Sequence, residues 1–405
     1  MGEQRSGTSN GQMLWALGLG GFLVNADNRA IAPMLPAIAH SLHTTSASAA
    51  LLVTAYSIPY GAFQLVYGPL AEKVGKVNTI LIALSLFAVG TVCCGLVDQF
   101  SWLLLLRFVT GMFAAGIIPT TLAQIGDRFS LSQRPKAIAF FMSFSTSGQA
   151  MGIVIGGLVA QFLSYRMLFI LLAVLSVPAI YAMLRQRHSS SRVAAPEADS
   201  LSRRYRLLMT TRRAWIVYGL VFTEGLVFYG GFTFLGVFGV TSLHLSYLVI
   251  GLLTATYSVG AFVGSRTITT VLARLGTKRM PILGSLLMTL GFGIIWGWQS
   301  VFVLTCGFVV LGFGFSYCHS TLQTFATDLL PNGRATAVSV FAFCLFLGSG
   351  LGPVGTGRVL DAYGAGAMLG SVTCAMLVFS LMCFGATRQK SGLGVAGLQH
   401  SERSL

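Results

Sequence analysis

The sequence predicts an all-α membrane protein with twelve transmembrane helices in two pseudo-symmetric six-helix halves. Composition is the first reason: 54% of the residues are hydrophobic, only 9% are charged and 48 are glycine, whereas a soluble domain carries roughly 25% charged residues. The second reason is a series of twelve apolar stretches near 20 residues in length, each long enough to cross about 30 Å of hydrocarbon. The third reason is an internal repeat.

The repeat relates the first half of the chain to the second half, at offsets of 200 or 201 residues. Trp15 recurs as Trp215, and the string Leu51–Ser57 recurs loosely as Leu252–Ser258. The further matches, in the same order, are Gly75 with Gly276, Asp127 with Asp328, Arg134 with Arg334, and Gly148, Gly152 and Gly157 with Gly348, Gly352 and Gly357. Two matching membrane halves are typical of a transporter, because one half can rock against the other around a site at the midplane.

The first half is expected over residues 13–185, after a polar tail at 1–12. Its six spans lie near 13–36, 48–70, 79–97, 102–124, 137–163 and 167–185. A polar, arginine-rich stretch at 186–213 then separates six spans from six, and we interpret it as a cytoplasmic basic linker. The second half covers 214–387, followed by a polar tail at 388–405, and its spans lie near 214–240, 247–270, 281–298, 302–327, 336–360 and 366–387.

The net charge of +15 is explained by membrane topology. If the N-terminus is cytoplasmic, the tails and inner loops hold 21 of the 26 Lys and Arg residues, while only Arg166 and Arg358 fall near outer ends. The positive-inside rule therefore places both termini in the cytoplasm of a multi-pass protein of the cell inner (plasma) membrane. This placement argues against nucleic-acid binding.

The sequence carries no pattern typical of a cofactor site. All seven cysteines fall inside predicted spans and lack metal-ligand spacing, so neither a metal site nor a disulfide framework is expected. No Gly-x4-Gly-Lys-Ser/Thr loop is present for ATP. Energy for transport would then come from ion gradients, at about 2.3 kcal/mol per charge per 100 mV.

The turn after the second span, Gly68-Pro-Leu-Ala-Glu72-Lys73-Val-Gly75-Lys76, resembles the hallmark loop of the major facilitator superfamily, Gly-x-Leu-Ala-Asp-Arg-x-Gly-Arg-Arg. It departs at Glu72, where the family usually has Asp, and at Val77, which replaces the last basic residue. The resemblance implies that the Glu72 carboxylate contacts the N-terminus of span eleven and latches the halves together, which a helix dipole would favour. The second copy of the loop has lost the acid.

Two further patterns resemble that superfamily. Span four contains Arg107, Gly111, Gly116 and Pro119, similar to a pattern common in proton-coupled antiporters. Span five has the glycine-rich antiporter motif with Ile153 in place of its proline; its glycines are Gly148, Gly152, Gly156 and Gly157, and the second copy has Gly348, Gly352 and Pro353. Glycine at every fourth position also lets helices pack closely, so tight packing at the interface of the halves is the alternative interpretation.

Ionisable residues inside spans are functional candidates, because a charge at the bilayer centre costs about 2.5–3.5 kcal/mol on insertion scales. Asp27 of span one and Arg107 of span four both lie about 21–22 Å above the inner boundary, so they can meet. A conformational change that separates them would favour protonation of Asp27 and couple proton uptake to transport. A static ion pair is the alternative, and Arg29 is the other candidate partner of Asp27.

Glu224 lies close to mid-membrane in span seven, without an obvious basic neighbour at its depth, and is a candidate proton carrier or site for cationic substrates. Phe228 and Tyr229 follow within a turn and a half, and aromatic rings beside an acid can bind a cation. The other polar and aromatic candidates for a wet, amphipathic substrate cavity are Asn25, Asn28, Tyr56, Tyr60, Gln64, Gln149 and His319; for His319, which lies nearer the inner side, a hydrogen bond between helices is the alternative.

The chain therefore resembles the major facilitator superfamily over roughly residues 13–387, and within it the twelve-span drug:proton antiporters. The resemblance implies a monomeric secondary transporter, not an enzyme, that exports an amphipathic or cationic small molecule in exchange for protons across the lipid bilayer. The alternatives are a proton-linked uptake or sugar/metabolite efflux carrier and, from other classes, a lipid flippase or a non-transporting receptor.

Overall fold

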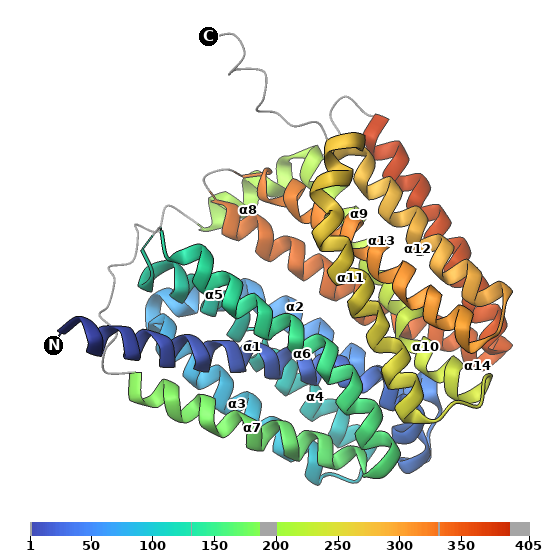
Figure 1. The fold of residues 1–405 in the computed structure, drawn as a ribbon, viewed down its shortest axis with the longest axis horizontal. Coiled ribbons are helices and arrows are strands. Elements are labelled where there is room, and N and C mark those ends of the chain that lie inside the picture. Colours follow the sequence, from blue (N-terminus) through green and yellow to red (C-terminus); the bar gives the residue numbers. More distant parts are fainter. Residues whose placement is uncertain (1, 131, 187–200, 331–332, 389–405) are drawn as a thin grey trace.

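The computed structural model of the chain describes residues 2–130, 132–186, 201–330 and 333–388, and every regular element in these segments is a helix. This follows from the apolar composition, because a backbone in hydrocarbon must satisfy its polar groups within the segment itself. Figure 1 shows two bundles of long helices, one from each half of the chain.

The first bundle contains seven helices. Span four is made of two of them, interrupted at Ala115 and Gly116. The helices are α1 (Gly2–Ser41), α2 (Ser46–Val74), α3 (Lys76–Leu96), α4 (Phe100–Ala114), α5 (Ile117–Arg128), α6 (Arg134–Phe162) and α7 (Tyr165–Gln186).

The second bundle follows a short helix, α8 (Leu201–Thr210). Span seven comprises α9 (Arg212–Glu224), a π-helical turn η2 (Gly225–Tyr229) and α10 (Gly230–Thr241). The other elements are α11 (Tyr247–Leu275), η3 (Thr277–Arg279), α12 (Met280–Gly297), α13 (Val301–Thr327) and α14 (Arg334–Arg388), which bends at Gly364 (φ +79°).

The described helices correspond to the twelve expected spans. Ten are long and apolar enough to cross a membrane. The ten exclude α1, whose apolar stretch is interrupted by Asn25, Asp27, Asn28 and Arg29, and they include α14 as one helix although its two arms on either side of Gly364 are separate spans.

The structure differs from the sequence-based expectation in two segments outside the spans, the N-terminal tail and the linker. Helix α1 begins at Gly2, so the expected tail at 1–12 is helical from its second residue. The expected linker at 186–213 includes the helix α8. The rest of that linker, 187–200, and the expected tail beyond Arg388 lie outside the described residues.

The glycine stripes pack helices within each half, not between the halves as the packing interpretation expected. A Cβ at Gly148, Gly152 or Gly156 of α6 would collide with the backbone of α1 in the same half. In the second half, Gly348 and Gly352 of α14 meet the backbone around Phe222, Leu226 and Gly230 of span seven in the same way. Glycine is required here because the helix backbones touch; only the last glycines of each stripe, Gly157 and Gly357, reach the opposite half.

The halves touch at one end of the molecule, which we call the contact end; it carries the α1–α2, α6–α7 and α10–α11 connections. There the Thr54 hydroxyl donates to the Gly350 carbonyl (2.6 Å), and the Tyr247 N–H donates to the Gln161 side chain (3.1 Å). At the opposite end, which carries the α2–α3 and α11–α12 turns, the ribbons of the halves diverge (Figure 1). We call this the splayed end.

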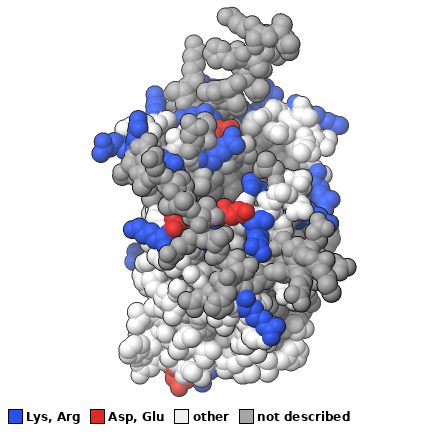
Figure 2. All heavy atoms as spheres, turned by 90° about the vertical axis from the view of Figure 1, so that its left-hand side faces the viewer, with Lys and Arg blue, Asp and Glu red and all other residues white. Residues whose placement is uncertain are grey.

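Basic side chains are abundant on the side where α1 begins, and few acidic side chains lie among them (Figure 2). The sequence places them in the turns of the splayed end, with Lys73, Lys76, Arg128, Arg134, Arg274, Lys278, Arg279 and Arg334.

Candidate functional site

A π-helical turn forms the centre of span seven and sets the direction of its functional side chains. The turn η2 begins directly after Glu224 and ends at Tyr229. A π-helix inserts an extra residue per turn and is frequent at functional sites. Glu224, directly before this turn, is buried against α13 of its own half, whereas Tyr229, at the end of the turn, reaches Arg29 of the other half.

In the first half, Asp27 and Arg107 form a buried ion pair. Arg107 Nη1 donates to Asp27 Oδ2 at 2.6 Å, and the two side chains are 1% exposed or less. The Arg107 guanidinium also lies over the Tyr56 ring, 4.3 Å from its centroid, and near Phe169. The contact expected from helix depth is therefore present, while Asp27 Oδ1 has no hydrogen-bond partner in the described chain.

Arg29 is not the partner of Asp27. Two residues along an α-helix differ by about 200° in direction, so Asp27 faces the interior of the first half and Arg29 faces the second half. There Arg29 Nη2 donates to the Tyr229 hydroxyl at 2.8 Å, and its guanidinium lies 4.7 Å from the centroid of the Tyr229 ring. The two residues are 200 positions apart, so they occupy equivalent places in the repeats.

In the second half, Glu224 has a basic neighbour that sequence reasoning missed. The carboxyl is fully buried, and its Oε2 lies 3.0 Å from Nδ1 of His319 on α13, with which it shares a hydrogen bond. His319 stacks on Phe315, with ring centroids 4.8 Å apart. The expectation of an isolated Glu224 is therefore wrong, and His319 lies at its depth rather than nearer one membrane face.

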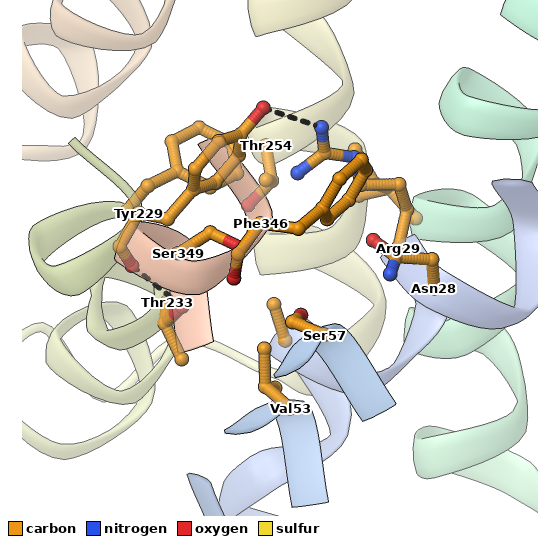
Figure 3. Close-up of a pocket in the computed structure, with 12 residues that line it drawn as sticks. Asn28, Arg29, Val53, Ser57, Tyr229, Thr233, Thr254, Phe346 and Ser349 are labelled. Carbon is orange, nitrogen blue, oxygen red and sulfur yellow. Dashed lines mark hydrogen bonds between the residues drawn. The ribbon is translucent and has the colours of Figure 1, made fainter. Parts of the chain in front are cut away.

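A small cavity of about 30 Å³ lies between the halves beside Arg29, about the space of one water molecule. Figure 3 shows Arg29 and Tyr229 on opposite sides of it, joined by their hydrogen bond. The lining residues come from both halves: Asn28, Arg29, Ala32, Val53, Ser57 and Ile153 from the first, and Tyr229, Phe232, Thr233, Thr254, Phe346 and Ser349 from the second.

The other expected substrate residues are dispersed. Asn25 donates its amide to Ser145 (2.6 Å), and Phe228 is fully buried in an aromatic cluster of the second half, so it cannot form a cavity wall in this conformation. Tyr56 lies beneath Arg107. Tyr60 is buried and stacks on Tyr56. The two remaining candidates, Gln64 and Gln149, are buried and half-buried.

Sequence reasoning also missed the small polar residues of the cavity. Ser57, Thr254 and Ser349 were not singled out, because serine and threonine are ordinary in membrane helices and carry no periodic signal. Phe346 was missed for the same reason. The repeat offered one clue, since Ser57 belongs to the duplicated string on span two.

The hallmark loop turns at Gly75, whose φ of +91° suits glycine, and Gly276 (φ +75°) makes the equivalent turn in the second half. Lys76 forms an ion pair with Asp127 at the end of α5. Glu72 is exposed, and Gly68 has open space around its Cα. Among the described residues Glu72 has no ion-pair partner, so the latch expected against span eleven is not engaged in this conformation.

Within the described segments, no three His, Cys, Asp or Glu residues lie close enough to hold a metal ion. The two buried acids are each held by one basic residue instead. The site therefore offers proton-binding groups and a cross-half hydrogen bond as its chemistry.

We expect His319→Ala to lower the thermal unfolding temperature, because it leaves the buried Glu224 carboxyl without a partner. An unsatisfied buried polar group costs about 1–3 kcal/mol. Removing both polar groups, as in Glu224→Met with His319→Ala, should recover much of the loss, and His40→Ala, at an exposed histidine, serves as the control. Equal unfolding temperatures for His319→Ala and His40→Ala would show that the pair does not stabilise the fold.

Comparison with known proteins agrees with this architecture. The family model of the Major Facilitator Superfamily matches residues 17–353 and 239–395. The uncharacterized MFS-type transporter YceJ of Bacillus subtilis (strain 168) is 25% identical over 375 residues, which cover 92% of this chain and 95% of YceJ.

Two further similarities are partial or structural. The multidrug efflux pump LfrA of Mycolicibacterium smegmatis is 28% identical over 168 residues, 41% of this chain and 33% of LfrA. The crystal structure of the nucleoside transporter NupG superposes with a TM-score of 0.77 at 16% identity, covering 93% of this chain and 100% of that one. The second similarity concerns the fold alone.

Proposed function

The chain belongs to the major facilitator superfamily and is a multi-pass membrane transporter, not an enzyme, and from this premise we propose that it exports an amphipathic small molecule in exchange for protons. Alternating access is the mechanism: the halves rock about a site between them so that each end opens in turn. The partial similarity to LfrA, an efflux pump, favours export.

The observation that carries proton coupling is the buried Asp27–Arg107 pair. The Arg107 guanidinium lies 2.6 Å from the Asp27 carboxyl in the core, and this positive charge favours the ionised form of Asp27. A carboxylate that loses its cation in a nonpolar region takes up a proton instead. A rearrangement within the first half that shifts α1 relative to α4 while the halves rock would therefore bind or release a proton in each cycle.

Glu224 with His319 is the second proton site in this proposal. Both acids lie in membrane spans, where an ionisable group is retained only at a cost. One pair belongs to each half, so protonation can bias both halves. The two pairs do not occupy equivalent positions in the repeat, since Glu224 corresponds to Val24 and Asp27 to Val227.

The positive-inside rule places the splayed end, with its basic turns, in the cytoplasm. In this orientation both termini are cytoplasmic, the membrane is the cell inner membrane, and the conformation described here faces inward. The contact end, closed by Arg29–Tyr229 and the hydrogen bonds around Thr54 and Tyr247, then seals the outer side. The protein works as a monomer in this proposal, because each chain contains both halves.

Reconstituted vesicles with an imposed pH gradient test the function. We expect a substrate from a panel of dyes, sugars and amino acids to move against its own gradient in the direction opposite to protons, and to stop when an ionophore collapses the gradient. Movement together with protons would identify the proton-linked uptake carrier instead, a role shared by other members of this fold. Movement unaffected by the ionophore would contradict proton coupling.

We expect Glu72→Ala to shift the conformational equilibrium toward the form with the splayed end open. The latch against α14 holds that end closed, and a charge at a helix N-terminus contributes about 0.3–1 kcal/mol, a roughly two- to fivefold change in population. Distances between spin labels at Ser132 and Arg274, one in each half, measure the shift in a cysteine-free background. Glu72→Asp keeps the charge and is the control, and unchanged distances with full transport in Glu72→Ala would reduce the loop to a marker of topology.

A further inference from the structure

Arg29 is a charge within a membrane span that no acid of the described chain neutralises. The two acids buried in the spans are engaged elsewhere, Asp27 by Arg107 and Glu224 by His319. The described ion pairs do not include Arg29, whose hydrogen-bond partner is the neutral hydroxyl of Tyr229. A charged residue at this depth is costly and is by default a functional candidate.

The groups around Arg29 are suited to an anion. A guanidinium has five N–H donors and cannot lose its charge, and one of the five is used by Tyr229. Asn28 and Ser57 also line the cavity, and neither side chain makes a hydrogen bond within the described residues. The hydroxyls of Thr233, Thr254 and Ser349 donate to backbone carbonyls, so they leave oxygen atoms but no free donors.

The apolar part of the lining lies beside this polar group. Phe346 and Val53 lie on the cavity wall (Figure 3), and Phe232 is a further lining residue. Donors beside aromatic rings suit the charged end of an amphipathic molecule. In the conformation described here the cavity of about 30 Å³ has room for no more than that end, and the apolar part would be accommodated as the halves move apart. The charge favoured by Arg29 is negative, whereas the sequence alone suggested a cation at Glu224.

We propose that the Arg29 cavity binds the carboxylate or phosphate group of an amphipathic organic anion, and that this anion replaces the Tyr229 hydroxyl as the partner of Arg29. This inference names the substrate class and rests on the proposed transport function. Charge-assisted hydrogen bonds to a guanidinium are about twice as strong as neutral ones, so the replacement is favourable.

The replacement also has a conformational consequence. Arg29 and Tyr229 belong to different halves, and their hydrogen bond lies in the region where the halves touch. Binding of an anion breaks this cross-half bond and weakens the contact end. The substrate thereby promotes opening on the side to which it is released. A ligand can shift a conformational equilibrium only when it binds the two states with different affinity, and the lost cross-half bond supplies that difference.

Thermal stabilisation of the purified protein tests the proposal with matched probes. The probes are 4-phenylbutyrate, its uncharged amide and the corresponding amine, with phenyl phosphate to separate phosphate from carboxylate recognition. We expect an acid, but not the amide or amine, to raise the unfolding temperature of the wild type. In Arg29→Gln the apparent affinity for that acid should fall about 10- to 100-fold, and in Arg29→Lys it should fall less.

Two variants separate recognition from a structural role. Tyr229→Phe removes the competing hydroxyl and should strengthen acid binding by a few fold, which a loss of packing would not do. Arg166→Gln removes an arginine whose side chain is 40% exposed at the contact end and should leave acid binding unchanged. Stabilisation by the amine or amide equal to that by the acids, equal effects of an acid on Arg29→Gln and wild type, or no effect of any acid would overturn the proposal.

The measurement also distinguishes this inference from proton coupling. Thermal stabilisation requires no gradient, so Asp27→Asn should still be stabilised by the acid even where gradient-driven transport is lost. An acid that binds through Arg29 in a protein without proton-driven transport would support the substrate class and reject the coupling. Proton-driven export of an amine, at equal rates in wild type and Arg29→Gln, would support proton coupling and reject the proposed substrate class.

Discussion

Asp27→Asn is expected to reduce transport driven by a pH gradient to near background while substrate binding persists. Asparagine resembles the protonated carboxyl in size and cannot release a proton, and its neutral side chain leaves Arg107 without its countercharge. The pair is buried at a distance of 2.6 Å, so no solvent replaces the missing charge. Initial rates in sealed vesicles with and without the gradient, together with thermal stabilisation by substrate, measure the two properties separately.

A matched control is available in Asp98→Asn. Asp98 also forms an ion pair with an arginine, Arg166, but its side chain is 72% exposed, and exposed pairs contribute little. We therefore expect wild-type transport from this variant. Full gradient-driven transport by Asp27→Asn would rule out the coupling role of Asp27 and make Glu224 the leading candidate.

Gly352→Ala is expected to destabilise the second half and lower the yield of folded protein. A Cβ at this position would collide with the backbone of Leu226 and Gly230, and backbone atoms cannot move aside as a side chain can. Overpacking in a close-packed interior costs about 1–3 kcal/mol and sometimes more. Thermal unfolding in detergent, followed by size-exclusion chromatography, measures the effect.

Gly355→Ala is the control on the same helix, three residues away. A Cβ there meets nothing within 4 Å, and alanine is favoured over glycine in a helix by up to about 1 kcal/mol. This variant should equal or exceed the wild type in stability. Equal losses in both variants would mean that the α14 glycines serve flexibility rather than close approach of the helices.

Much of the site could be anticipated from residue spacing. The depths of Asp27 and Arg107 along their helices predict that they can meet, because helix rise and span direction determine depth in a membrane. The chemical cost of a buried charge identified Glu224 as well. Neither argument determines which face of a helix points where, so the choice between Arg107 and Arg29 stayed open until the structure was known.

The pairing of Glu224 with His319 depended on a feature that spacing does not contain, the contact of span seven with α13, because His319 lies 95 positions further along the chain. The direction of Tyr229 relative to Glu224 depended on a second such feature, the π-helical turn between them. Periodicity arguments assume a regular helix, and they fail where the register shifts.

The sequence by itself determined the membrane class, the duplicated halves, the approximate spans and the family, because apolar length, charge placement and repeats are properties of the chain alone. Only the tertiary structure decided that Arg29 meets Tyr229 across the halves, that the glycine stripes pack within each half, and that Glu72 is unlatched. These facts depend on how two rigid bundles are rotated and tilted against each other. That arrangement is set by packing between distant segments and differs between conformations of the same sequence.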